Sequence, residues 1–106
     1  MMCLYKKIMN KELYITINHL DEFINASSIK VNDVLTLKKD INNEFDDEAI
    51  IALNENNFKC GYVANSVSSV VRGTYSAGRI YDLINENTTC KVKFIALESN
   101  FLIAQL

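Results

Sequence analysis

Short segments in which apolar and polar residues alternate recur along this chain of 106 residues, and turn-forming residues separate them. Alternation with a period of two is typical of a β-strand that buries only one face. Two continuous apolar segments joined by a turn at residues 55–57 add a hairpin to this pattern. The predicted strands cover residues 12–18, 33–39, 49–53, 58–63, 90–97 and 101–106. The alternating residues expected to face the core are Leu13, Ile15, Ile17, Leu35, Leu37, Cys90, Val92, Phe94 and Ala96.

The segment between the fourth and fifth predicted strands favours two short helices. Asn65 can cap the first, which ends at Gly73, and Ser76 can cap the second, which ends near Asn85. The residues expected to be buried by these helices are Val67, Val70, Val71, Ile80, Leu83 and Ile84. Gly61 interrupts the fourth strand, which indicates a bulge or a close approach of another backbone.

Short antiparallel strands in a small chain protect their edges best by curling into a barrel. We therefore predict an α+β fold that is mainly β: a small, OB-like, partly open β-barrel. It would have five or six strands, with the two short helices placed before the last two strands. We expect residues 12–106 to form a single domain and residues 1–11 to form an N-terminal extension that frays.

Composition excludes several classes of protein. The 49% hydrophobic and 23% charged content is that of a globular domain rather than a disordered chain. No apolar run approaches the roughly 18 residues that a membrane span needs, and the N-terminus lacks the apolar core of a signal peptide, so we expect a cytoplasmic protein without membrane contact. A net charge of −2 argues against coating nucleic acid by charge alone.

The sequence gives little indication of a metal site or of an enzyme active site. Three widely spaced cysteines and one histidine, His19, do not match a zinc site and fit free thiols better. The acidic loop at residues 40–48 lacks the glycine of a calcium-binding loop, because Phe45 stands in that place. A Cys–His pair involving His19 is the one nucleophilic arrangement available. We expect no metal, no cofactor and no enzymatic activity.

Three short strings in the sequence resemble one known family. Residues 42–50 (NNEFDDEAI) follow the second predicted strand, residues 61–63 (GYV) continue in register, and residues 73–82 (GTYSAGRIYD) lie downstream. The first string resembles the N-x-Y/F-D-x-x-A-I signature of the HIRAN domain, and the second resembles the G-Y-V/I that closes the next strand of that family. The third resembles the corresponding segment of small, stand-alone bacterial HIRAN-like proteins. The resemblance covers residues 12–106.

The resemblance implies an OB-like binding module that captures the 3′ end of single-stranded DNA, in the context of DNA repair or replication. By the matching motif, Phe45 would be a stacking wall, and Asp46 would accept a hydrogen bond from the free 3′ hydroxyl. Asn43 would shape the loop or contact the terminal nucleotide, and Phe23 would be the opposing wall. A protein partner such as a helicase or a remodelling ATPase is also implied.

The phosphates of a bound strand need cations that the motif does not specify. The stretch from His19 to Phe23 is acidic where DNA-binding family members carry arginine and tyrosine, and Ala64 and Asn65 stand where those members carry lysines. The basic residues that remain as candidate phosphate contacts are Lys38, Lys39, Lys59, Arg72 and Arg79.

Two alternatives stay open. Asp46 can cap the turn that starts the strand at residues 49–53, and Phe45 can simply cover the mouth of the barrel. At the level of function, the alternative is a protein-interaction module that keeps the barrel but has lost DNA-end binding, and that pairs through an exposed strand such as residues 101–106. DNA binding requires a basic rim around Phe45 and Asp46. The alternative predicts a neutral or acidic rim and an exposed apolar patch elsewhere.

Overall fold

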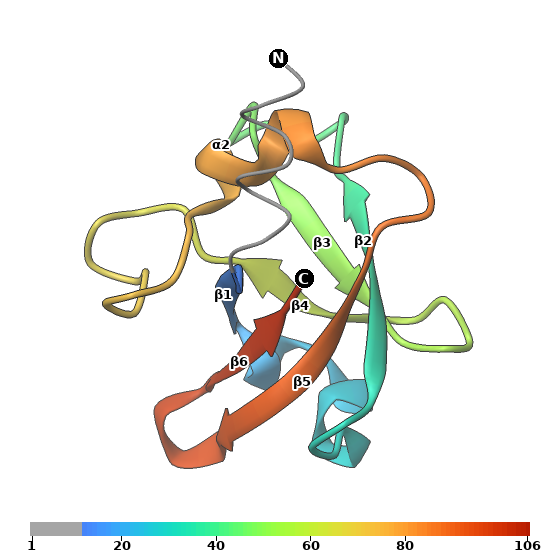
Figure 1. Cartoon of the computed structure of the whole chain (residues 1–106). Coiled ribbons are helices and arrows are strands. Elements are labelled where there is room, and N and C mark those ends of the chain that lie inside the picture. The colour runs from blue at the N-terminus through green and yellow to red at the C-terminus, as the bar shows by residue number, and fades with distance from the viewer. Residues whose placement is uncertain (1–11) are drawn as a thin grey trace.

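The structure is a computed structural model that describes residues 12–106, so the predicted N-terminal extension at residues 1–11 lies outside the described residues. The strands are β1 (Tyr14–Asn18), β2 (Val34–Lys39), β3 (Ile50–Leu53), β4 (Lys59–Val63), β5 (Thr89–Ala96) and β6 (Phe101–Gln105). They pair antiparallel in the order β1-β4-β3-β2-β5-β6, and β6 pairs with β1 to complete a closed barrel (Figure 1). The predicted fold class and strands are confirmed.

Closure of the ring is more complete than the partly open barrel that we predicted. The five register pairs from Tyr14↔Gln105 to Asn18↔Phe101 join β1 to β6, and β5 pairs with the other side of β6. The free edge that we predicted at residues 101–106 is therefore absent. The reason is geometric: the hydrogen-bonding groups of β6 are already used on both sides.

Short helical turns lie at both ends of the barrel (Figure 1). They are the 3₁₀ turns η1 (Leu20–Glu22), η2 (Ile24–Ser28), η3 (Tyr81–Leu83) and η4 (Leu97–Ser99), and the α-helix α2 (Ala77–Ile80). The second predicted helix is confirmed in α2 and η3, and the Oγ of Ser76 caps it by accepting from the N–H of Arg79 (3.3 Å). Ile80 and Ile84 are buried as predicted, but Leu83 is exposed, because the helical turn ends at that residue. No helix within residues 12–106 is long and apolar enough to cross a membrane.

The first predicted helix is wrong, because residues 65–73 form turns instead. Val67, which we expected to be buried, is fully exposed (100%). The Oγ of Ser66 bonds to the Oγ of Ser69 (2.7 Å), and the N–H of Val71 donates to the Oγ1 of Thr16 (3.1 Å). Hydrogen bonds between serine side chains compete with the backbone hydrogen bonds of a helix. The bond from Val71 to Thr16 holds the segment against β1, where Thr16 is buried.

The core is formed by the inward faces of the strands and by α2. Ile15 and Ile17 in β1, Leu35 and Leu37 in β2, and Cys90 and Val92 in β5 are buried as predicted. Thr16, on the opposite face of β1, is buried as well, so burial does not alternate along that strand. The largest fully buried apolar side chains are Ile15, Ile17, Leu35, Leu37, Ile50, Ile80, Val92 and Leu102. Gly61 faces this interior, and a Cβ there would lie 2.7 Å from the carbonyl oxygen of Asn18, so the predicted close approach of backbones is confirmed.

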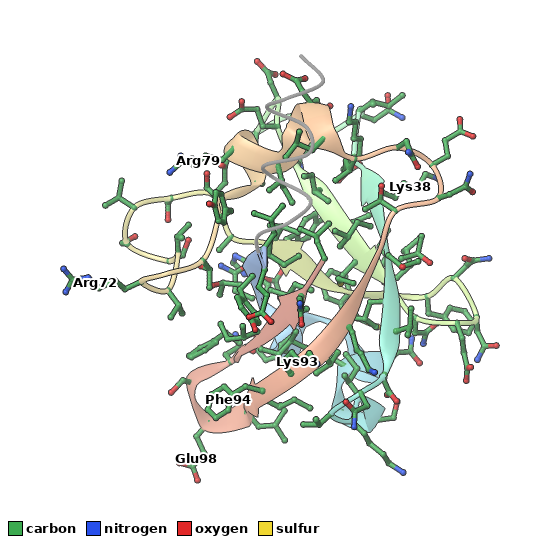
Figure 2. The ribbon with its side chains drawn as sticks, viewed as in Figure 1. Lys38, Arg72, Arg79, Lys93, Phe94 and Glu98 are labelled. Carbon is green, nitrogen blue, oxygen red and sulfur yellow. The ribbon has the colours of Figure 1, made fainter. Side chains whose placement is uncertain are left out.

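A bulge in β5 overturns the second half of the predicted alternation in that strand. Val92 pairs with Ala104 and Phe94 with Ile103, so Lys93 is the extra residue. The shift turns Phe94 outward (55% exposed), and Ile95 packs against the core in its place. Lys93 and Phe94 lie side by side on β5 near the turn into β6 (Figure 2).

Candidate nucleic-acid interface

A cleft of about 670 Å³ opens where the loop between β2 and β3 faces the end of β4 and the start of the segment at residues 65–69. Three of the predicted site residues, Asn43, Phe45 and Asp46, line it together. The other lining residues are Asn18, His19, Glu22, Asn42, Glu44, Ala49, Tyr62, Val63, Ala64, Asn65, Ser66 and Ser69.

Asn43 organises the loop on one side of this cleft. Its Oδ1 accepts from the backbone N–H groups of Phe45 (2.8 Å) and Asp46 (2.9 Å), and its Nδ2 donates to the Oδ2 of Asp40 (3.3 Å). An asparagine that bonds the backbone two and three residues ahead fixes a tight turn. The turn presents the side chain of Phe45 almost wholly to solvent (95% exposed).

Asp46 has a positioning role that can be followed bond by bond. Its Oδ1 accepts from the N–H of Glu48 (2.9 Å), which supports the turn before β3. Both carboxylate oxygens accept from the Nδ2 of Asn65, at 3.3 Å for Oδ1 and 3.0 Å for Oδ2. The Oδ1 of Asn65 in turn accepts from the N–H of Gly78 (2.8 Å) in α2. Asn65 therefore ties the loop at residues 40–49 to α2, and this link fixes the carboxylate of Asp46 at the cleft.

The second aromatic side chain in the lining of this cleft is Tyr62, a residue that the sequence analysis did not assign to the site. Tyr62 projects from β4, and its ring lies 6.3 Å from that of His19 and 5.9 Å from that of Phe23. Partial burial raises the pKa of the Tyr62 hydroxyl, and the carboxylates of Asp40 and Glu22 raise it further. Tyr62 is the middle residue of the GYV string, and that string was the available signal.

Phe23, which the resemblance placed at the opposing wall, does not line this cleft. It contacts Tyr62 and lines a separate hollow of about 310 Å³ between η1, η2 and η4. The contact between its ring and that of Tyr62 is of the tilted kind that aromatic pairs favour.

The charge of the cleft is negative. Glu22, Glu44 and Asp46 line it, and no lysine or arginine within residues 12–106 does. The imidazole of His19 contacts the carboxylate of Glu22, and both side chains are about half exposed. The basic rim that DNA binding was predicted to need is therefore not part of the cleft lining.

The predicted phosphate contacts lie elsewhere and fall into two groups. Lys38, Lys39 and Lys59 line a second cleft of about 710 Å³ over β2, β3 and β4. The ammonium group of Lys39 lies 4.4 Å from the centre of the Tyr81 ring. Arg72 and Arg79 lie on the other side of the view in Figure 2, away from Lys38.

The thiols of the described residues are unsuited to nucleophilic chemistry. Cys60 and Cys90 are both free and buried. Burial raises the pKa of the Cys60 thiol and raises that of Cys90 to about 12. Both thiols therefore stay protonated near neutral pH, so neither forms the thiolate that a Cys–His pair with His19 would need. Within residues 12–106, no group of three or more His, Cys, Asp or Glu side chains could hold a metal ion.

Comparison with known proteins places the fold. No family model matches the sequence, and no curated protein matches it either. The crystal structure of the HIRAN domain of human HLTF has a TM-score of 0.68 at 18% identity, covering 89% of this chain and 71% of that one. A crystal structure of a protein from Lactobacillus plantarum has a TM-score of 0.62 at 15% identity and covers 89% of both chains. The structural similarity and the resemblance of residues 42–50 to the HIRAN signature thus point to the same fold. The chain has a HIRAN-like fold.

Proposed function

We propose that this protein is a nucleic-acid-binding module that holds the terminal nucleotide of single-stranded DNA, with its free 3′ hydroxyl, in the cleft beside Asp46. One observation carries the proposal: a single cleft brings together two accessible aromatic rings, Phe45 and Tyr62, with the oxygen acceptors of Asn43 and Asp46. Base stacking on an aromatic side chain contributes roughly 1–3 kcal/mol. The HIRAN-like fold supports this assignment.

The acidity of the cleft suits one kind of strand end. A terminal sugar with a free hydroxyl is neutral and can donate a hydrogen bond to a carboxylate. A terminal phosphate would instead face the carboxylates of Glu22, Glu44 and Asp46, and none of the described lysines or arginines lines the cleft. The cleft therefore selects the hydroxyl end by attraction and rejects a phosphate end by repulsion.

Fluorescence anisotropy tests the proposal directly. At about 50 mM salt, where phosphate contacts are strongest, we compare a short single strand bearing a 3′ hydroxyl with the same strand bearing a 3′ phosphate. The hydroxyl strand should bind more tightly. Equal binding of the two strands contradicts the proposal. Absence of binding of either strand at protein concentrations up to about 100 μM also contradicts it, because even nonspecific binding of nucleic acid has dissociation constants of about 10⁻⁴ M or lower.

Variants then assign the residues. Phe45→Ala should weaken binding of every strand end, because it removes a stacking surface. Asp46→Asn should reduce the preference for the hydroxyl strand, while it keeps an oxygen for the N–H of Glu48. Asp47→Asn is the matched control, because Asp47 carries the same charge next to Asp46 but does not line the cleft. An unchanged preference in Asp46→Asn would remove Asp46 from the site.

In the same proposal, the module acts in DNA repair or replication, together with a helicase or a remodelling ATPase. A module that binds strand ends would serve such an enzyme by directing it to the end. Addition of the module to a helicase assay should change activity on substrates with a free 3′ end and leave blocked ends unaffected.

A protein-interaction module is the second candidate, and two observations favour it. In the part of the chain that the structure describes, no lysine or arginine lines the cleft, and Phe94 and Leu97 are exposed at the β5–β6 end of the barrel. If no strand binds, sedimentation velocity across a range of concentrations tests self-association through this end. Association that Leu97→Ser abolishes would support the second candidate, and a monomer at all concentrations would count against pairing of this chain with itself.

A further inference from the structure

We infer that a strand whose end occupies the cleft continues across the outer face of β3 into the second cleft, where Lys38 and Lys59 bind its phosphates. This inference rests on the proposed function and adds the path of the strand to it. It selects two of the five candidate phosphate contacts and excludes Arg72 and Arg79 from that role.

The register of the sheet connects the two clefts. Lys38 pairs with Ile51, and Ile51 pairs with Tyr62, so these three residues form one row across β2, β3 and β4. Residues opposite each other in neighbouring strands share a face of the sheet, so Lys38 and Tyr62 lie on the outer face on either side of Ile51. Tyr62 lines the first cleft, and Lys38 and Ile51 line the second.

A second row on the same face completes the path. Thr36 pairs with Leu53, and Leu53 pairs with Lys59 across a bulge. Lys38, Ile51, Leu53 and Lys59 all line the second cleft. Ile51 is buried (3% exposed) and Leu53 is half-buried, so Leu53 is the main apolar surface between the two lysines. Lysines on both sides of a groove suit the phosphates of a single strand.

The lysines of the second cleft retain their charge for a ligand. Asp40 and Glu86 also line this cleft, yet within residues 12–106 no carboxylate lies within 4 Å of the ammonium group of Lys38 or Lys59. Lys39 differs, because its ammonium group already lies over the ring of Tyr81. The charge is thus positive in the second cleft and negative in the first, which favours a neutral strand end in one and phosphates in the other.

The two arginines do not fit this path. The guanidinium group of Arg79 lies 5.1 Å from the centre of the Tyr75 ring, and Arg79 lines neither cleft. Arg72 projects from the outer end of the segment between β4 and α2, on the opposite side of the view from Lys38 (Figure 2). It also lines neither cleft.

Strand spacing gives the length of DNA that the path requires. Neighbouring strands lie about 4.8 Å apart, so the backbones at Tyr62 and Lys38 are separated by about 10 Å. At the roughly 3.4 Å rise per nucleotide of a stacked strand, this corresponds to about three nucleotides. A dinucleotide is therefore too short to reach the lysines, whereas a hexanucleotide is long enough.

The experiment measures how binding of a 3′-hydroxyl dinucleotide and a hexanucleotide depends on salt, by anisotropy between 50 and 200 mM. Two phosphate contacts on a single strand contribute about −1.4 to the slope of log K against log salt concentration, or about a sevenfold loss of affinity over this range. The double variant Lys38→Gln/Lys59→Gln should lose this contribution on the hexanucleotide and bind the dinucleotide as the native protein does. Lys38→Arg/Lys59→Arg, which keeps both charges, should retain the slope.

Arg72→Gln/Arg79→Gln is the matched control, with two charges removed outside the path, and its slope should equal that of the native protein. A slope that falls in this variant, or that stays unchanged in Lys38→Gln/Lys59→Gln, overturns the path. Dinucleotide binding would still support the proposed function in that case. Failure of both oligonucleotides to bind overturns the proposed function and the path together.

Discussion

Replacement of Asn65 by alanine is expected to detach the loop at residues 40–49 from α2. The side chain of Asn65 donates to both carboxylate oxygens of Asp46 and accepts from the N–H of Gly78. These groups are partly buried, so water replaces the lost partners only in part. The substitution thus tests whether a single amide joins the two sides of the cleft.

The expected cost follows from the bonds that are lost. A hydrogen bond to a charged group contributes about 1.5–3 kcal/mol and a neutral one about 0.5–1.5 kcal/mol. Because the network is partly solvated, we take the low end of that sum, about 2 kcal/mol. At roughly 4–8 °C per kcal/mol for a domain of this size, the melting temperature should fall by about 8–16 °C.

Equilibrium unfolding in urea, followed by circular dichroism, measures this cost if the m-values of the variant and the native protein agree. Asn56→Ala is the matched control: Asn56 lies in the hairpin turn between β3 and β4, and its side chain makes no hydrogen bond to the described residues. Asn65→Asp should be less stable than Asn65→Ala at pH 7, because it sets a second carboxylate against Asp46. Equal midpoints for Asn65→Ala and Asn56→Ala would refute the reasoning.

Three further substitutions test the fold. Gly61→Ala should cost about 1–3 kcal/mol, because its Cβ would lie 2.7 Å from the carbonyl oxygen of Asn18, and an unchanged urea midpoint would show that β1 and β4 can separate freely. Burial raises the pKa of the Cys90 thiol from 9.0 to about 12 in the folded protein. Above pH 9 the thiol therefore ionises in the unfolded chain before it ionises in the folded one, so the contribution of Cys90 to the free energy of unfolding is complete below pH 9 and declines above it. The native protein should therefore lose about 2 kcal/mol relative to Cys90→Ala between pH 8 and pH 10.5 in urea titrations, and parallel curves would disprove this. Val67→Ser should change stability by less than about 0.5 kcal/mol, and a larger loss by the same measurement would mean that Val67 is packed.

The strands could be predicted because each depends on a local pattern. Alternation fixes which face of β1 and β2 is buried, and the observed bounds lie within two residues of those predicted. The errors occur where a partner distant in the sequence decides the outcome. Thr16 holds residues 66–71 in turns through a bond to Val71, and the pairing of β5 with β6 produces the bulge that exposes Phe94.

The candidate site divides in the same way. The turn made by Asn43 and the cap made by Asp46 follow from side chains that bond their own loop, and sequence carries such chemistry well. The Tyr62 wall and the displacement of Phe23 do not follow from sequence, because η1, η2 and β4 set those rings together only once the barrel closes. The second cleft likewise depends on the register of three strands.

Pairing of the first described strand with the last has a consequence for biosynthesis. The N–H of Leu106 donates to the carbonyl oxygen of Leu13 (2.9 Å), so residue 106 bonds to the segment at the start of the barrel. In a nascent chain, β1 can pair with β4 early, but the barrel cannot close until β6 has left the ribosome. Contacts between distant segments also slow folding, to the millisecond-to-second range of small all-β domains. Until the barrel closes, the apolar strands depend on the exit tunnel or on chaperones for protection from aggregation.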